Sequence, residues 1–468
     1  MKSQRRRALR WQLVGALVLS FCALTAPISA KAQTTCTFGS SQGFNVVWGC
    51  GGVSSPLVQG TFALVDAYQF YPGTGGDICA AMHSALAATA IYTPLKQGIV
   101  VDARGFGGGS WSCNSNPWLG LTYPPSSIVA LLPAATISLS TTWQLPRHTR
   151  IVGEGSGSNR TILKAVSPGF SGGDMIDMGP PGCSDADYPA ISIEHLALNG
   201  NSVSNLNGIV NPCAQELSYV DDVSFTQISL IALEVTTKNA ANSGPYTKLT
   251  MSNVGTCLSI SSPTQGTSLY DMRSVQGVSC TLSSSSSSGI LLDAASTSLE
   301  DINITGVSSN QNGIVVGSRY PSPNNLLFNI RGSGLVDVIQ LSSHPYTPTV
   351  TAPNCPATNS TTTYDVCNIT ILGVTSSSST NSIDDKVTST VLIDPNVGMY
   401  ILGEPVESAG ASVGNSRLTT SPNVPSWSVG TSAASSLESC TKGSIYSQTS
   451  GTGSTTLFGC NGTWAAIR

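Results

Sequence analysis

The sequence predicts an all-β fold in which short strands stack as the rungs of a coil. The main observation is a recurring pattern: an aliphatic residue, any residue, then His, Asp or Asn, then a second aliphatic residue. Successive copies begin 27, 31, 18, 30, 28 and 39 residues apart, which is typical of stacked repeats with loops of variable length. One repeat cannot bury its own apolar face, so the repeats must form an array. The seven copies occupy residues 193–196, 220–223, 251–254, 269–272, 299–302, 327–330 and 366–369.

The polar residue of the pattern is expected to lie at a bend. Its two aliphatic residues are three positions apart, yet both must face the core, so the chain has to turn between them. Asn and Asp suit such a turn, because they tolerate unusual backbone angles and bind local amides. On successive rungs these side chains would stack as a ladder. Its predicted members are His195, Asp222, Asn253, Asp271, Asp301, Asn329 and Asn368.

Residues 1–32 have the pattern of a secretory signal. Four arginines precede an apolar stretch at residues 13–26, and the segment ends in Ala30-Lys31-Ala32, an A-x-A cleavage motif before Gln33. The apolar stretch is short for a membrane span, and no later segment is long and apolar enough to be one. We therefore expect an exported protein, located in the periplasm, at the cell surface or in the medium.

The charge balance makes nucleic acid an improbable partner. Removal of residues 1–32 takes away six basic and no acidic side chains, which leaves 15 basic against 25 acidic groups and a net charge of −10. Nucleic-acid binding usually requires a basic stripe. Only 10% of the residues are charged, so Ser, Thr, Asn and Gly must supply most of the polar surface.

Twelve cysteines remain after residue 32. An even number in an exported chain favours disulfides, and no two cysteines have the C-x-x-C spacing of zinc sites. Pairing of nearest neighbours would close six local loops, for example Cys355 with Cys367 and Cys440 with Cys460. Spacing alone leaves other connectivities open.

The expected elements follow in order along the chain. Residues 33–65 form an N-terminal leader. Residues 77–89 form an Ala-rich helix with Asp77 as its N-cap. Strands are expected at 98–102, 128–132, 136–140, 149–152, 161–165 and 175–178, and second strands begin at Gly208, Gly289 and Gly313. The coil is assigned to residues 66–400, a Ser/Gly/Pro-rich linker to 401–436 and a disulfide-tied hairpin to 437–468.

This order of elements resembles the pectate-lyase-like superfamily. The features that carry the resemblance are the helix, the Val-Val-Asp strand at 100–102, the Thr-Arg-Ile-Val-Gly-Glu-Gly segment at 149–155, the strand that begins at Thr161, and the repeats with Asp or Asn. The resemblance covers residues 66–395 and implies a single-stranded right-handed parallel β-helix capped by the N-terminal helix. It implies no particular enzyme family, because the Gly-His-Gly and Arg-x-Lys motifs of polygalacturonase-like hydrolases are absent.

A candidate site lies in the outward column that directly follows the bend. In the expected register Arg273, Asn303 and Arg331 are consecutive in this column, with Glu300 and Asp301 beside them. Arginines bind carboxylates through forked hydrogen bonds, and carboxylates can act as acid and base. The arrangement favours a uronate-containing glycan, although the same charges could simply form a solvated face. The full expected column is Ala197, Ser224, Gly255, Arg273, Asn303, Arg331 and Thr370.

A second acidic group is a candidate for binding Ca²⁺. Its members are Asp174, Asp177, Asp185 and Asp187, and carboxylates are the usual ligands of this ion. No paired-histidine or other metal motif accompanies them.

Two functional hypotheses follow. The first is an exported β-helix that acts on or binds an extracellular polysaccharide through an outer face, and as an enzyme it would be a polysaccharide lyase or glycoside hydrolase. The second is a non-catalytic surface scaffold or adhesin-like protein. The fold alone does not choose between them.

Overall fold

The fold is seen in a computed structural model, which describes most of the repeat region and parts of the chain after it. The described residues are 63–71, 73, 77–90, 98–121, 127–155, 160–179, 190–212, 214, 217–236, 243–261, 273–319, 322, 324–342, 369–385, 391–393, 416–417, 427–430, 445–448, 456–461 and 463–466.

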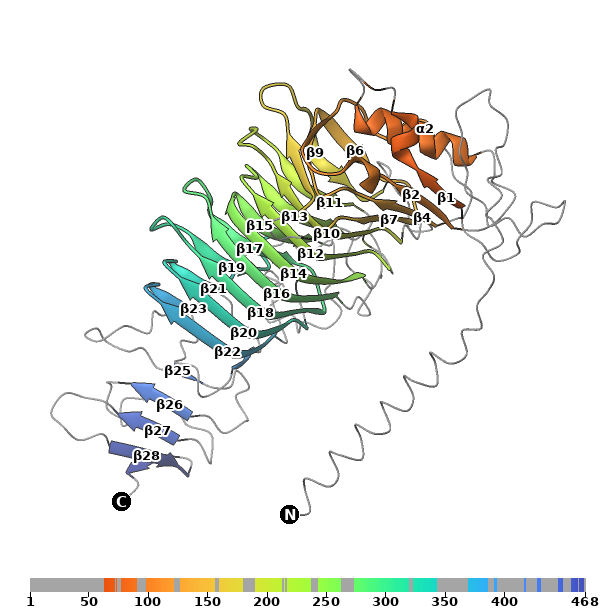
Figure 1. The fold of residues 1–468 in the computed structure, drawn as a ribbon. Coiled ribbons are helices and arrows are strands. Elements are labelled where there is room, and N and C mark those ends of the chain that lie inside the picture. The colour runs from red at the N-terminus through yellow and green to blue at the C-terminus, as the bar shows by residue number, and fades with distance from the viewer. Residues whose placement is uncertain are drawn as a thin grey trace, which may run out of the picture. The chain divides into compact units, whose positions relative to one another are not determined.

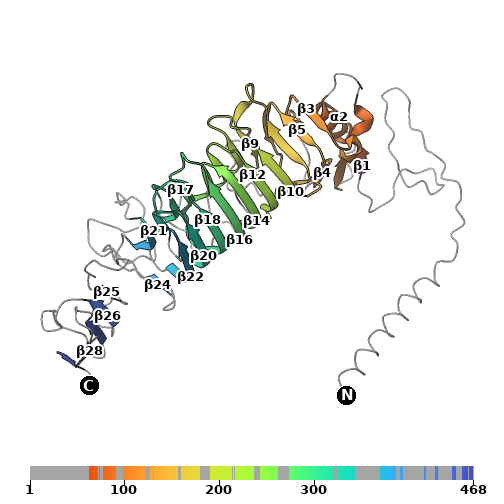
Figure 2. The same cartoon turned by 60° about the vertical axis from the view of Figure 1, so that its left-hand side comes forward.

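Two long sheets of parallel strands form the coil (Figures 1 and 2). Successive strands of each sheet come from successive rungs, so the chain winds as a right-handed parallel β-helix, as the sequence predicted. Sheet A contains β1 (Ala63–Asp66), β2 (Ile99–Asp102), β4 (Ile128–Leu131), β7 (Thr149–Val152), β10 (Ser192–Asn199), β12 (Tyr219–Thr226), β14 (Ser243–Val254), β16 (Arg273–Leu282), β18 (Thr297–Thr305), β20 (Leu326–Ser333), β22 (Ile369–Ser377) and β24 (Val391–Ile393), with β3 (Ser110–Cys113), β5 (Thr136–Leu139) and β8 (Ile162–Ala165) paired beside this path.

Sheet B runs beside sheet A along the coil, and the two are joined by corners and loops. Aliphatic side chains from both sheets fill the interior as one continuous core. Sheet B contains β6 (Thr141–Gln144), β9 (Ser171–Asp177), β11 (Asn207–Asn211), β13 (Ile231–Thr236), β15 (Thr256–Ser261), β17 (Ser288–Asp293), β19 (Asn312–Val316), β21 (Asp337–Leu341) and β23 (Asn381–Asp385).

The predicted helix is α2 (Ile78–Ala90), and it covers the first rungs of the coil (Figure 1). Asp77 caps it, because the Asp77 Oδ1 accepts a hydrogen bond of 2.6 Å from the Ala80 backbone N–H. Ile78, Met82 and Leu86 are fully buried. Short 3₁₀ turns, η1 (Ala67–Phe70) and η3 (Arg104–Phe106), complete this end.

Four members of the predicted bend ladder lie where the pattern placed them. His195, Asp222, Asp301 and Asn329 have φ values of 56°, 52°, 55° and 53°, so each takes the left-handed conformation that turns the strand. The ladder is bonded from rung to rung, since His195 Nδ1 lies 2.9 Å from Asp222 Oδ2 and Asn329 Nδ2 donates to Asp301 Oδ1 at 2.5 Å. The structural interpretation of these four residues is confirmed.

On the intervening rungs, residues other than the predicted ones lie at the bend. Thr247 pairs with Gln276 and Leu249 with Val278, which puts Lys248 (φ 54°) and Gly277 (φ 70°) at the bend. The prediction for Asn253 is therefore wrong: this residue has φ 55° but lies at the end of β14, at a different corner.

Asp271 and Asn368 lie outside the described residues, and the bend positions of their rungs are taken by Gly277 and Gly373 (φ 69°). Glycine reaches positive φ without steric cost, so a pattern that requires a polar side chain misses these rungs.

The two described disulfides agree with nearest-neighbour pairing. Cys79 bonds to Cys113 and Cys257 to Cys280, and Cys460 is also disulfide-bonded. The first bond ties α2 to β3. The second ties β15 to β16, and both bonds are buried.

A separate five-stranded sheet follows the coil in the chain. The predicted hairpin is present as the antiparallel pair of β27 (Ile445–Gln448) and β28 (Thr456–Cys460). The segment expected to be a linker contributes β25 (Ser416–Arg417) and β26 (Trp427–Gly430), and β29 (Trp464–Ala466) completes the sheet. In the part of the chain that is described, no helix has the length and apolarity needed to cross a membrane.

The glycines that begin the Gly-Ile-Val strands are required for a steric reason. A Cβ at Gly313 would lie 2.4 Å from the Val338 carbonyl oxygen on the next rung, and Gly208 has the same relation to Ala232. We expect Gly313→Ala to lower the melting temperature and to cost about 2 kcal/mol or more, because the rung above must shift.

Gly98→Ala is the matched control, since its Cβ would meet only the Ser127 oxygen at 3.5 Å. Thermal unfolding followed by circular dichroism checks the pair. Equal melting temperatures for the two variants would contradict the steric explanation.

Candidate functional site

The predicted outward column is wrong at three of its seven positions, because Thr250, Ser279 and Thr375 occupy the places expected for Gly255, Arg273 and Thr370. Arg273 pairs with Ser243 and Thr297 at the start of β16, is 2% exposed, and donates from Nη1 to the Ala295 carbonyl at 3.1 Å. Its predicted place in the column is wrong, because the bend of this rung falls at Gly277 and not at Asp271. The observed column is Ala197, Ser224, Thr250, Ser279, Asn303, Arg331 and Thr375.

The other four predicted site residues do lie together on β18 and β20. Asn303 pairs with Arg331 across the two rungs, Glu300 pairs with Phe328, and Asp301 accepts a hydrogen bond from Asn329. We call these six residues the β18–β20 patch. Their predicted catalytic role stays a prediction, and the pair of exposed arginines that would have clamped a uronate is absent.

A cleft of about 560 Å³ opens at the other sheet, near the helix-capped end. Its floor consists of β6 and β9, and its wall is the segment that follows β3. Most of the lining residues carry amide, hydroxyl or carboxyl groups, and Leu119 is the one large apolar side chain among them. The lining residues are Asn114, Ser115, Asn116, Leu119, Thr141, Thr142, Gln144, Ser171, Gly173, Asp174 and Asp177.

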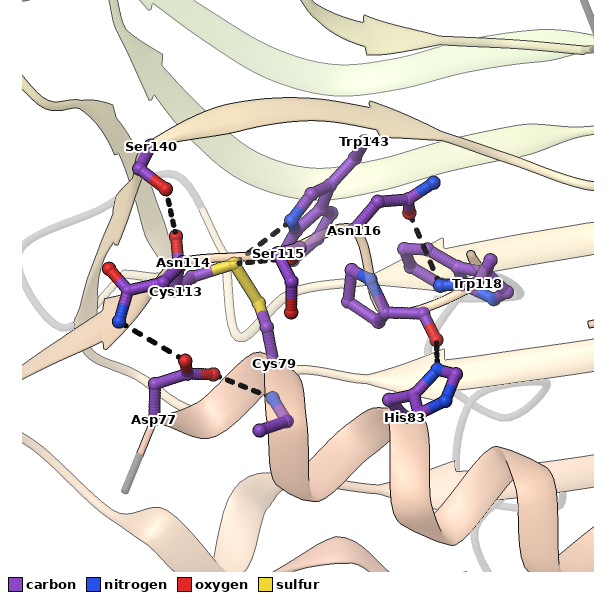
Figure 3. The surroundings of a disulfide bond; sticks show 12 residues. Asp77, Cys79, His83, Cys113, Asn114, Ser115, Asn116, Trp118, Ser140 and Trp143 are labelled. Atoms are coloured by element: carbon purple, nitrogen blue, oxygen red, sulfur yellow. Dashed lines mark hydrogen bonds between the residues drawn. A yellow bond between two sulfur atoms is a disulfide. The ribbon is translucent and has the colours of Figure 1, made fainter. Parts of the chain in front are cut away.

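The wall of the cleft is fastened to α2 (Figure 3). The Cys79–Cys113 bond fixes the end of β3, and the next residue, Asn114, donates from Nδ2 to Asp77 Oδ2 at 3.2 Å. Further along, His83 Nδ1 lies 2.9 Å from the Pro117 carbonyl oxygen. The helix cap therefore also holds one side of the cleft.

Hydrogen bonds and an aromatic contact also join the wall segment to the floor of the cleft. Asn116 Nδ2 donates to the Gln144 carbonyl at 3.5 Å, and Asn116 Oδ1 accepts from the Trp118 backbone N–H at 3.2 Å. The Trp118 and Trp143 rings meet edge to face, with centroids 5.4 Å apart. These contacts anchor the polar lining on a buried aromatic pair.

Asp174 and Asp177 form a carboxyl pair in the floor. Burial raises the pKa of Asp177 to about 7, and the charge of Asp174 and a hydrogen bond to it act in the same direction. Asp174 also accepts a hydrogen bond of 2.8 Å from Asn207 Nδ2. Asp177 thus carries a proton up to near-neutral pH and donates it in the hydrogen bond to Asp174.

A third carboxyl, Glu234, lies two rungs along the same outward column. The register runs from Gln144 to Asp177, Val210, Glu234 and Ser259, so two rung spacings, roughly 10 Å, separate Asp177 from Glu234. Burial raises the pKa of Glu234, as does the charge of Asp174, while Arg319 opposes the shift.

The predicted calcium ligands are brought together only in part. Asp174 and Asp177 are neighbours, and Asp185 and Asp187 lie outside the described residues. Calcium takes six to eight oxygen ligands, and the described residues contain no group of three or more His, Cys, Asp or Glu side chains that could hold a metal ion.

Sequence reasoning undervalued Asp177 and missed Asn116, Gln144 and Glu234. Residues three apart on a regular strand face opposite sides, which separates Asp174 from Asp177. The register against β6 shifts here, from Thr141 with Ser171 to Trp143 with Ile176, and the irregular strand brings both carboxyls to the cleft. The Gly172–Gly173 pair was the available signal for this irregularity.

No known protein family matches the chain, and no curated protein is similar to it in sequence. Two solved structures are similar in part. One is Geobacillus virus E2 ORF18, at 11% identity and a TM-score of 0.38, over 70% of this chain and 61% of that one. The other is the A-module of Azotobacter vinelandii mannuronan C-5 epimerase AlgE4, at 12% identity and a TM-score of 0.27, over 70% of this chain and 97% of that one. The fold assignment rests on the strand topology of this chain.

The raised pKa of Asp177 predicts a pH-dependent stability. Between about pH 4 and 7 the unfolded chain loses the Asp177 proton while the folded chain keeps it, so the free energy of unfolding falls as the pH rises through this range. Asp177→Asn removes this dependence. We expect the variant to be more stable than the wild type at pH 8, by on the order of 1 kcal/mol because partial exposure screens the effect, with the difference vanishing near pH 4.

Thermal unfolding at pH 4, 6 and 8 checks this expectation. Glu154→Gln, at an exposed carboxyl, is the control and should show the wild-type pH dependence. A pH-independent difference between Asp177→Asn and the wild type would show that the carboxyl does not titrate as described.

Proposed function

We propose that this protein binds an extracellular polysaccharide in the cleft of β6 and β9 and cleaves it with Asp177 as the general acid. One observation carries the proposal: a proton-bearing carboxyl pair lies in a polar cleft. The cleft volume, about 560 Å³, falls within the range of about 300–1,000 Å³ typical of ligand sites. A strongly shifted carboxyl in a cleft is a recognised sign of acid–base chemistry.

The chemistry of the lining favours a neutral glycan. Amide and hydroxyl groups of Asn114, Asn116, Thr142 and Gln144 can exchange hydrogen bonds with sugar hydroxyls, and the 67% exposed Leu119 offers an apolar contact. A lining with two carboxyl groups and no basic side chain disfavours a negatively charged uronate. The uronate hypothesis depended on two neighbouring arginines, and that pair is not formed.

Hydrolysis with inversion of configuration fits the arrangement of the carboxyls. Asp177 donates its proton to the glycosidic oxygen as the C–O bond breaks. Glu234 takes a proton from the water that attacks the anomeric carbon from the other side. Their backbone positions lie two rung spacings, roughly 10 Å, apart, and side chains that lean toward each other would bring the carboxyl groups into the range of about 6.5–9.5 Å that leaves room for that water. Asp174 holds the proton on Asp177 between turnovers.

An exported location, which we also propose, fits this role. The expected signal at residues 1–32 would deliver the chain out of the cytoplasm, and the disulfides Cys79–Cys113 and Cys257–Cys280 suit an oxidising compartment. We place the protein in the periplasm, at the cell surface or in the medium, where it would meet polysaccharide.

A non-catalytic glycan-binding scaffold is the second candidate function. The long, regular coil favours it, because rungs at a constant spacing present a rigid surface to a polymer. Binding without turnover distinguishes this function from the first.

The test is release of reducing ends from xylan, β-glucan and cellulose, with pectin and alginate as charged counterparts, in the presence of calcium and of a chelator. We expect turnover of a neutral glycan, and a loss of about 100-fold or more in kcat for Asp177→Asn, the size of a general-acid contribution. Glu154→Gln is the matched control and should retain full activity. Wild-type activity should decline above about pH 7, as Asp177 loses its proton.

Unchanged turnover in Asp177→Asn would refute the assignment of the acid. Products that retain the anomeric configuration, measured by NMR, would refute the role of Glu234. Binding of a neutral glycan with no turnover by the wild type would establish the scaffold instead.

A further inference from the structure

A second surface with the chemistry of sugar binding lies on sheet A, at the β18–β20 patch. It consists of three side-chain pairs on two neighbouring rungs: Glu300 with Phe328 before the bend, Asp301 with Asn329 at the bend, and Asn303 with Arg331 after it. The Phe328 ring is 45% exposed. An exposed aromatic ring among hydrogen-bonding groups offers an apolar face on which a sugar ring can stack.

We propose that this patch binds an extended neutral polysaccharide at a place distinct from the cleft. The inference rests on the proposed function for its ligand class only. The apolar C–H face of a sugar ring would stack on Phe328. The Glu300 carboxylate, the Asn303 amide and the Arg331 guanidinium on either side would bind its hydroxyls, and the two-pronged groups among them fix its orientation.

The charges of the patch favour a neutral sugar. Glu300 and Asp301 are acidic and Arg331 is basic, so the patch has a small net negative charge that disfavours a uronate. Asp301 is held by Asn329 and Glu300 by Ser298. The salt bridges of the described residues do not include Arg331, and its exposed side chain can reach a ligand.

The hydroxyl groups on neighbouring rungs extend the surface along the coil axis. Both outward positions after the bend carry Ser or Thr on most rungs from β12 to β22, and the strand pairing places them in register. Rungs repeat about every 4.8 Å, close to the advance of one sugar in an extended chain, so a glycan along the axis would meet a polar group at each residue. These hydroxyls belong to Ser224, Thr226, Thr250, Ser252, Ser279, Thr281, Thr305, Ser333, Thr375 and Ser377.

The patch is not an extension of the cleft. The cleft lies on β6 and β9 of sheet B, whereas β18 and β20 belong to sheet A and follow β10 by four and five rungs. Figure 1 shows β6 and β9 well apart from β18 and β20 along the coil. The patch would therefore hold a polymer without taking part in its cleavage.

The experiment measures adsorption of the full-length exported protein to microcrystalline cellulose and insoluble xylan, with alginate gel as the charged probe. We expect the wild type to adsorb to at least one neutral probe, and Phe328→Ala and Arg331→Ala each to weaken adsorption about tenfold or more. Val307→Ala, at a 53% exposed apolar residue outside the patch, is the matched control and should adsorb like the wild type.

Three results would overturn the inference: no adsorption of the wild type to either neutral probe, wild-type adsorption by Phe328→Ala and Arg331→Ala, or Arg331-dependent adsorption to alginate alone. Turnover of a short soluble oligosaccharide separates this surface from the cleft. Phe328→Ala should keep that turnover, while Asp177→Asn should keep adsorption. Patch-dependent adsorption without any turnover would support the patch and refute the catalytic proposal.

Discussion

The rest of the structure depends on the hydrogen bonds that join each strand to the strand at the same position of the next rung. Parallel pairing fixes the rung spacing, and the spacing makes every outward position a column that runs along the coil. A turn that appears on one rung must then appear on all of them. This requirement selects a left-handed backbone conformation at Asp222, Lys248, Gly277 and Asp301, which carry three different kinds of side chain. The close approach of the next rung leaves no room for a Cβ at Gly313.

The cleft lies where this regularity is interrupted. At the capped end the helix, the Cys79–Cys113 bond and the irregular strand β9 depart from the repeat. A uniform rung array offers flat faces, and a hollow requires a wall that does not belong to the stack. The segment after β3 provides that wall, and its attachment to α2 gives the polar lining a rigid support, as a binding site requires.

The carboxyl groups of the cleft and those of the β18–β20 patch lie in different environments. In the cleft, burial and a neighbouring carboxyl keep a proton on Asp177. This environment lowers the free energy of unfolding at neutral pH, and it suits the group for proton transfer. On the patch, Glu300 and Asp301 stay near water and are held by Ser298 and Asn329, an arrangement suited to binding. In the proposed function, the coil separates the cleaving site from the binding surface by sheet and by rung.

The sequence by itself determined the coil, the capping helix, four members of the ladder and the local pairing of cysteines, because periodicity, a helix cap and spacing are local signals. The tertiary structure decided the register. Gly277 could take the bend in place of Asp271 since conformation, not side-chain chemistry, is what the turn demands, and this moved Arg273 from the surface to the interior. The cleft likewise could not be predicted from the sequence. It depends on the irregular strand β9 and on a wall formed by a segment some 30 residues earlier in the chain, and these bring together groups that a regular strand would have kept apart.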